Sequence, residues 1–142
     1  VDHKDSVTVL TIDENGDVYF VTQYRLGAER QLLELPAGVI EDGEPPEICA
    51  MREIKEEIGM AAENLKLLGD FYLVPGYCNE HMYTYLATGL FPSPLKPDAD
   101  EFLQINKIPY QQVLEMMKSG NIQDVKTLAT LALAFPILGF PT

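Results

Sequence analysis

The chain has 142 residues, of which 46% are hydrophobic and 23% are charged, a composition typical of one soluble globular domain rather than a disordered chain. Its 22 acidic and 10 basic residues give a formal net charge of −12, which argues against duplex nucleic acid or an anionic membrane as a partner. An anionic small substrate is compatible with this charge where bound divalent cations offset the acidic groups. We therefore expect one domain over residues 1–142.

Two strands and a turn are predicted at the start of the chain. Residues 7–12 and 18–24 are rich in β-branched types, and residues 13–17 between them supply turn chemistry. This pattern predicts a β-hairpin. A short strand is expected next, over residues 32–35.

A helix is predicted after the loop at residues 41–44. Pro45 and Pro46 suit the first turn of a helix, and Gly59 is a good carboxyl-terminal cap. The helix should therefore run from these prolines to about Ile58.

The second half of the chain is predicted to hold three strands followed by two helices. In chain order these cover residues 65–74, 81–90, 102–108, 111–118 and 123–135. Strands, helix, strands and helices in this order favour a mixed sheet with helices packed on its faces, an α/β architecture.

Cysteine usage and hydropathy indicate a cytosolic protein. Cys49 and Cys78 match neither a disulfide framework nor a paired metal motif, so we expect reduced thiols. The longest apolar stretch, residues 128–140, contains Pro136 and is shorter than the ~20 residues of a membrane span. No signal peptide is evident, and a start at Val1 is compatible with further native residues, including strands, before it.

The predicted helix carries a cluster of carboxylates. Glu53, Glu56 and Glu57 stand at i, i+3 and i+4, so their side chains converge on one patch. The three charges repel one another, and a hard divalent cation with oxygen ligands, such as Mg²⁺, reverses the sign of that interaction. The alternative is a solvated acidic face on which Arg52 simply pairs with Glu56.

The spacing around this cluster resembles the Nudix box. In order, the chain has Gly38, five residues, Glu44, seven residues, Arg52-Glu53-Ile54, one residue, Glu56-Glu57, one residue, and Gly59-Met60. The resemblance implies an α/β/α sandwich around a mixed β-sheet. It also implies hydrolysis of a nucleoside diphosphate linked to another group, with Mg²⁺ or Mn²⁺ held by the box glutamates.

Site roles follow from the same resemblance. The implied metal site consists of Gly38, Glu53, Glu56, Glu57 and, outside the box, Glu101. Glu53 and Glu57 would be the principal ligands, and the missing Cβ of Gly38 would let the main chain come close to metal or phosphate. Arg52 would orient the catalytic carboxylates, and Glu44 would be a supporting acid.

Features outside the box resemble the ADP-ribose pyrophosphatase subgroup. They are QYR at 23–25, LELPAG at 33–38, Pro75 sixteen residues after Gly59, and the segment 120–128. The resemblance implies substrate-binding roles for Arg25, Glu34, Gly76 and Glu80, with Arg25 near the phosphates or nucleotide and Glu80 near the terminal ribose. The alternatives are an exposed arginine at a strand end and an ordinary loop glutamate. His81 is expected to start a strand rather than to take part in catalysis.

The general base is left open. In this subgroup it usually comes from the acidic loop before the late strand, here residues 97–102. Glu101 falls at a metal-facing position, but Ala99 stands where some relatives carry a catalytic glutamate. The base is therefore Glu101, Asp100 or a box glutamate, and the loop could instead be a solvated connector.

Taken together, these features predict Mg²⁺- or Mn²⁺-dependent hydrolysis of ADP-ribose or a related ADP-sugar to AMP and a sugar phosphate. Two alternatives stay open: a broader house-cleaning hydrolase of diphosphate-linked nucleosides, and a non-catalytic nucleotide sensor. Subgroup members commonly dimerise through additional amino-terminal strands, whereas this chain begins almost at the first strand. A homodimer is therefore a hypothesis carried by resemblance alone.

Overall fold

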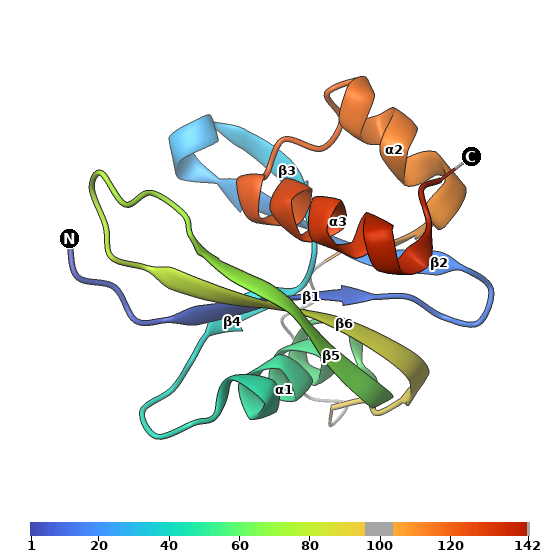
Figure 1. The fold of residues 1–142 in the computed structure, drawn as a ribbon, viewed down its shortest axis with the longest axis horizontal. Helices are drawn as coiled ribbons and strands as arrows, with labels where there is room; N and C mark the ends of the chain where they lie inside the picture. Colours follow the sequence, from blue (N-terminus) through green and yellow to red (C-terminus); the bar gives the residue numbers. More distant parts are fainter. Residues whose placement is uncertain (96–103, 142) are drawn as a thin grey trace.

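The computed structural model describes residues 1–95 and 104–141. In chain order its elements are β1 (Ser6–Thr11), β2 (Asp17–Arg25), η1 (Leu26–Ala28), β3 (Arg30–Glu34), β4 (Ala37–Val39), α1 (Pro46–Ile58), β5 (Met60–Tyr72), β6 (His81–Pro92), β7 (Gln104–Pro109), α2 (Tyr110–Lys118) and α3 (Val125–Leu138). Helix α1 lies on one side of the strands, and α2 and α3 lie on the other (Figure 1).

The described strands form two sheets. One is mixed, with the order β4-β1-β6-β5, and the other has the order β3-β2-β7. Strand β1 pairs in parallel with β6, from Ser6 opposite Met82 to Thr11 opposite Ala87, and antiparallel with β4. Because both faces of the four-stranded sheet are covered, every residue of β1 is buried.

Apolar side chains fill both sides of the mixed sheet. The cluster under α1 contains Val7, Val9, Tyr19, Val21, Cys49, Ala50, Ile54, Ile58, Tyr85 and Ala87. The cluster under α2 and α3 contains Leu10, Val18, Phe20, Leu35, Leu86, Tyr110, Val113, Ile122, Leu131, Ala134 and Phe135. The alternation of β1, with Val7 and Val9 on one face and Leu10 in the other cluster, produces these two cores. This arrangement confirms the predicted α/β/α sandwich.

The predicted amino-terminal hairpin is wrong in its pairing. Strands β1 and β2 are present, with the turn between them, but they belong to different sheets and meet only at an isolated bridge between Ile12 and Val18. Both edges of β1 are already occupied, by β4 and β6, and both edges of β2 by β3 and β7. Strand β4 was not predicted from the sequence.

The ends of α1 agree with the sequence. Pro46 is the first helical residue, and Gly59 ends the helix with φ +66°, donating its amide to Ile54 O and Lys55 O. Helix α3 begins later than predicted, at Val125, because Asp124 caps it by accepting a hydrogen bond from the Thr127 amide. None of the described helices combines the length and apolar character that a bilayer crossing requires.

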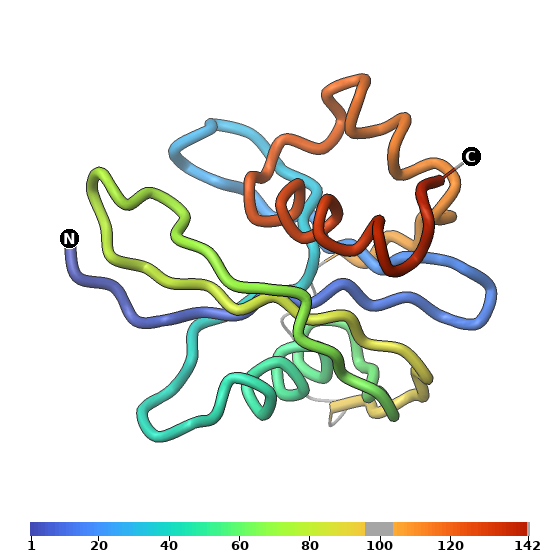
Figure 2. Tube along the Cα trace, viewed as in Figure 1, coloured from blue at the N-terminus to red at the C-terminus, as the bar shows by residue number. Residues whose placement is uncertain are grey.

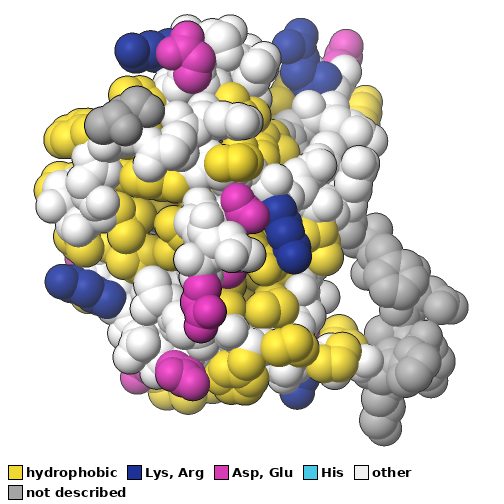
Figure 3. Space-filling model, turned by 90° about the vertical axis from the view of Figure 1, so that its right-hand side faces the viewer, with side chains coloured by type: hydrophobic (Ala, Val, Ile, Leu, Met, Phe, Trp, Pro, Cys, Tyr) yellow, Lys and Arg dark blue, Asp and Glu magenta, His cyan; other side chains and the backbone are white. Residues whose placement is uncertain are grey.

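The amino-terminal segment, residues 1–5, runs beside the loop between β5 and β6 (Figure 2). The Asn79 amide donates to Val1 O at 3.2 Å, and the His3 amide donates to Asn79 Oδ1 at 2.8 Å. On the face drawn in Figure 3, charged side chains of both signs are scattered among hydrophobic ones.

Candidate active site

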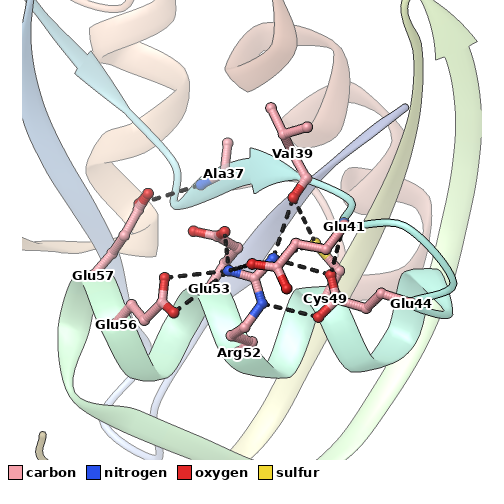
Figure 4. Close-up of polar contacts among 9 residues, drawn as sticks. All are labelled: Ala37, Val39, Glu41, Glu44, Cys49, Arg52, Glu53, Glu56 and Glu57. Carbon is pink, nitrogen blue, oxygen red and sulfur yellow. Dashed lines mark hydrogen bonds and ion pairs between the residues drawn. The ribbon is translucent and has the colours of Figure 1, made fainter. Parts of the chain in front are cut away.

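Helix α1 directs Arg52, Glu53 and Glu57 toward the segment that contains β4 (Figure 4). Ala50, Ile54 and Ile58 on the opposite arc are buried in the core. Glu57 Oε2 accepts a 3.3 Å hydrogen bond from the Ala37 amide, just before Gly38. Glu53 is only 8% exposed. Two of the three predicted carboxylates therefore point into the protein rather than into bulk solvent.

Arg52 connects the acidic side chains of this region. Its Nε and Nη2 atoms bind Glu44 at 2.9 and 3.0 Å, and its Nη1 binds Glu53 Oε1 at 2.9 Å. Glu56, which is exposed, lies 3.3 Å from the same Nη1 atom. The hydrogen bonds from Arg52 lower the pKa of Glu44 to about 2. The guanidinium thus fixes the rotamers of the acids around it.

The pKa values of the two inward-pointing carboxyl groups, Glu53 and Glu57, are raised above the usual value for glutamate. Burial raises the pKa of Glu57 to about 8, and the charge of Glu53 adds to this rise. Burial also raises the pKa of Glu53 to about 7, where the positive charge of Arg52 opposes the rise and Glu56 reinforces it. A divalent cation would displace these protons, because it replaces carboxylate repulsion with attraction.

Gly38 lies directly against Glu53. A Cβ at position 38 would come within 2.0 Å of Glu53 Cδ and 2.1 Å of Glu53 Oε1. Only a residue without a side chain allows the Glu53 carboxylate to reach the main chain of β4. This packing explains why position 38 has to be glycine.

The residues present fit a divalent cation. Glu53 and Glu57 offer hard oxygen donors, with Glu56 and the main chain of Gly38 nearby. No three acidic, histidine or cysteine side chains within residues 1–95 and 104–141 form a complete ligand set on their own. Mg²⁺ commonly takes only one or two carboxylates and completes its shell with water and substrate phosphate. A partial set of carboxylates beside an open cavity therefore matches this ion.

A cavity of about 430 Å³ opens beside these groups. Its lining consists of His3, Ser6, Gln23, Arg25, Ala37, Gly38, Val39, Glu57, Leu73, Glu80, Met82 and Lys126. The lining comes from both sheets, from α1 and from α3. Basic side chains thus face the box carboxylate Glu57 across a space large enough for a small molecule.

One buried acid binds two basic side chains of the cavity lining. Glu34 is fully buried and binds Arg25 through both carboxylate oxygens, at 2.6 and 2.7 Å. Lys126 Nζ donates to the same carboxylate at 2.7 Å and to Asp124 Oδ1 at 2.9 Å. Burial alone would raise the pKa of Glu34, but hydrogen bonds from Arg25 and Lys126 outweigh it and lower that pKa. Glu34 therefore stays ionised and positions both basic groups.

Ser6, Glu80 and His3 form a further part of the cavity lining. Glu80 Oε2 accepts a 2.7 Å hydrogen bond from Ser6 Oγ and lies 3.7 Å from His3 Nδ1. His81 is not part of the lining. Its ring binds Asp70 Oδ1 at 2.8 Å and packs against Tyr72 and Tyr83, at the first position of β6.

Comparison with known proteins places the chain in a family. The NUDIX domain family matches residues 2–131. The chain belongs to the Nudix family. It is 35% identical over 129 residues to "ADP-ribose pyrophosphatase" of Bacillus subtilis, covering 89% of this chain and 70% of the relative.

Other relatives of this Nudix chain carry different names. It is 34% identical to "Methanol dehydrogenase activator" of Bacillus methanolicus, covering 90% of this chain and 70% of that protein. It is 32% identical to "GDP-mannose pyrophosphatase" of an Enterobacter strain, covering 92% and 73%. A crystal structure of an "ADP compounds hydrolase" superposes with a TM-score of 0.85 at 25% identity, covering 94% of this chain and 72% of that one. These matches confirm the resemblance carried by the Nudix box.

The structure brings some of the predicted site residues of this Nudix chain together and separates others. Arg25, Gly38, Glu57 and Glu80 line the same cavity. Glu53 lies against Gly38, Glu56 lies on the outer side with Arg52, and Glu34 lies behind Arg25. Gly76 lines a separate hollow with Val1, Asp2, Tyr72, Pro75, Tyr77, Cys78 and Asn79. Glu101, Asp100 and Ala99 lie outside the described residues.

Sequence reasoning missed several lining residues of the Nudix cavity. Lys126 received no role, although it lies within the segment 120–128 that resembles the subgroup. His3, Ser6 and Gln23 were also not assigned. Only the fold could reveal Lys126, because its partner Glu34 is 92 residues away in the chain.

Proposed function

We propose that this Nudix hydrolase cleaves the diphosphate of ADP-ribose or a related ADP-sugar, giving AMP and a sugar phosphate. The observation that carries the proposal is the cavity that joins Arg25 and Lys126 to Glu57 and Gly38 of the box. A diphosphate needs cationic groups for its oxygens and a site for a divalent ion, and this cavity offers both. The printed names of relatives support the substrate class.

The side chains of the cavity account for binding and orientation. Arg25 and Lys126 are positioned to donate charge-assisted hydrogen bonds to phosphate oxygens, and the buried Glu34 limits their movement. Glu53 and Glu57, with Glu56 and Gly38, would hold the cations. When bound, Mg²⁺ or Mn²⁺ would neutralise the diphosphate and lower the pKa of a water molecule there. The general base stays a prediction, with Glu101, Asp100 and a box glutamate as its candidates.

The catalytic role is tested by Glu57→Gln. The substitution keeps the shape of the side chain but removes a carboxyl group that can ionise to hold a divalent cation, so kcat on ADP-ribose should fall on the order of 100-fold or more. Glu14→Gln, at an exposed residue of the β1–β2 turn, is the matched control and should leave kcat unchanged. Circular dichroism of both variants checks that they fold. A wild-type protein without turnover on any diphosphate would instead support the nucleotide-sensor alternative.

A broader nucleotide-sugar specificity is the second candidate, because relatives named GDP-mannose pyrophosphatase also match. Initial rates with Mg²⁺ on ADP-ribose, ADP-glucose, GDP-mannose and dinucleoside polyphosphates distinguish the two. A preference for the ADP-sugars supports the first function. Equal rates across the panel count against it and favour the broader house-cleaning role.

Finer points of the proposal concern the ion, the assembly and the location. We propose Mg²⁺ as the working ion, a single domain over residues 1–142 and a cytosolic location, the last because Cys49 and Cys78 are both free thiols. A homodimer is also proposed. Sedimentation showing a monomer at micromolar concentration would exclude it.

A further inference from the structure

His3 lies next to Glu80 in the proposed site. It lines the same cavity as Glu57, and its Nδ1 atom lies 3.7 Å from Glu80 Oε2. The His3 side chain is 38% exposed and the Glu80 side chain 16% exposed. The pair is therefore open to the cavity but partly shielded from solvent, which strengthens any hydrogen bond made there.

The hydrogen bonds of His3 determine what its ring can offer. Its Nδ1 lies 2.5 Å from the main-chain oxygen of Lys4. A carbonyl oxygen only accepts, so Nδ1 carries the hydrogen, and Nε2 of the neutral ring is an acceptor. No residue within the described part of the chain is bonded to Nε2. Glu80 accepts one hydrogen bond, from Ser6 Oγ, and as a carboxylate it has capacity for more.

The attachment of the amino-terminal segment does not depend on contacts of the His3 ring. The Asn79 amide donates to Val1 O, and the His3 amide donates to Asn79 Oδ1. Both bonds use main-chain atoms of the amino-terminal segment. Replacement of the imidazole therefore leaves the segment attached to the β5–β6 loop.

The pairing register of β1 indicates how far Glu80 and His3 lie from the proposed diphosphate site. Ala37, whose amide binds Glu57, is opposite Thr8, and Ser6, which binds Glu80, is two residues earlier on the same strand. At ~3.3 Å per residue, positions 6 and 8 of the strand are about 7 Å apart. A diphosphate between Arg25, Lys126 and Glu57 carries a group at each of its two ends, and one of these groups would lie within reach of Glu80 and His3.

We propose that His3 is a specificity-determining residue that binds the terminal sugar together with Glu80. Nε2 of His3 and the Glu80 carboxylate are two acceptors in the lining of one cavity, and they match hydroxyl groups of a sugar, each of which donates one hydrogen bond. A cavity end of this kind favours a hydroxylated sugar over an apolar group. The inference rests on the proposed function and adds His3 to it.

The test compares two substrates that differ only in the sugar. ADP-ribose is assayed beside ADP methylated on its terminal phosphate, which keeps the diphosphate diester and lacks the sugar. His3→Ala should raise KM for ADP-ribose about tenfold with little change in kcat, the loss of one hydrogen bond, and should leave KM for the methyl ester unchanged. His3→Gln, which places an amide near the position of Nε2, should restore most of the affinity. Lys4→Ala is the control, because the Lys4–Asp42 pair is exposed.

The outcomes separate the two proposals. Equal effects of His3→Ala on both substrates, or no effect on ADP-ribose, would overturn the assignment of His3. A wild-type enzyme that hydrolyses the methyl ester but not ADP-ribose would overturn the proposed substrate and the sugar site with it. Thermal midpoints of the three variants, expected to match that of the wild type, exclude a loss of folding as the cause.

Discussion

At the scale of single residues, Gly38 makes the sharpest prediction. Gly38→Ala introduces a methyl group where Glu53 Cδ stands 2.0 Å away, so the Glu53 carboxylate has to move. A displacement of about 1 Å in a catalytic group can cost about 100-fold in rate, and we expect a loss of kcat of that order. Steady-state hydrolysis of ADP-ribose at saturating Mg²⁺ measures it.

Gly27 provides the control for this substitution. A Cβ at Gly27 meets nothing within 4 Å, so Gly27→Ala should leave kcat within about twofold of the wild type, as expected of an unobstructed surface substitution. Wild-type activity in Gly38→Ala would show that Glu53 works equally well from another position. The close contact with Glu53 would then not be what requires glycine at this site.

The site was predictable from sequence only where its residues are close in the chain. Glu53, Glu56 and Glu57 share one helix, so their spacing alone indicates that they cluster. Spacing did not reveal that Glu53 and Glu57 point inward while Glu56 points outward, because this depends on β4 lying over the helix. Glu34, predicted to bind substrate, is fully buried and binds Arg25 and Lys126, which line the cavity.

At the scale of elements, helix α1 predicts a pH dependence of stability. The pKa values of Glu53 and Glu57, about 7 and about 8, lie above the value of 4.5 for a free glutamate. A carboxyl with a raised pKa in the folded state holds its proton more tightly when folded. Its contribution to stability is fullest below about 4.5 and is lost as the pH rises through 7 and 8.

Chelator-treated protein should therefore be less stable at about pH 9 than at about pH 6. Urea unfolding at the two pH values measures the difference, and Glu57→Gln should reduce it by roughly 1–3 kcal/mol, because the amide does not ionise. Excess Mg²⁺ at about pH 9 should restore stability to the wild type more than to the variant. An identical pH dependence in both proteins would mean that Glu57 is ionised over the whole range.

The sequence predicted the ends of helix α1, which depend on local residues, but it did not predict which strands pair with each other. Pro46 and Gly59 mark the ends of α1 because each acts on its own main chain. The pairing of β1 depends on β4 and on β6, a partner more than seventy residues later. No local signal distinguishes that parallel ladder from a hairpin with β2, and a three-residue strand such as β4 is too short to show a period.

At the scale of the whole molecule, the net charge of −12 opposes the approach of an anionic substrate. Near the cavity Arg25 and Lys126 are already paired with Glu34 and Asp124, so they supply no excess of positive charge. The overall field therefore decides the sign of the long-range interaction, and it is repulsive. Salt screens it, with a Debye length that falls from ~30 Å at 0.01 M to ~8 Å at 0.15 M.

We accordingly expect kcat/KM on ADP-ribose to rise a few-fold as NaCl increases from about 0.01 M to about 0.15 M at constant low Mg²⁺. The rise should come from a lower KM, with kcat unchanged. A variant with Glu14, Glu63 and Glu115 changed to glutamine keeps the cavity intact, because these exposed acids do not line it. Its salt dependence should be flatter, since its field is weaker by three charges. If kcat/KM instead falls with salt in both proteins, the local cations Arg25 and Lys126 dominate the encounter, and substrate is attracted to the cavity despite the acidic chain.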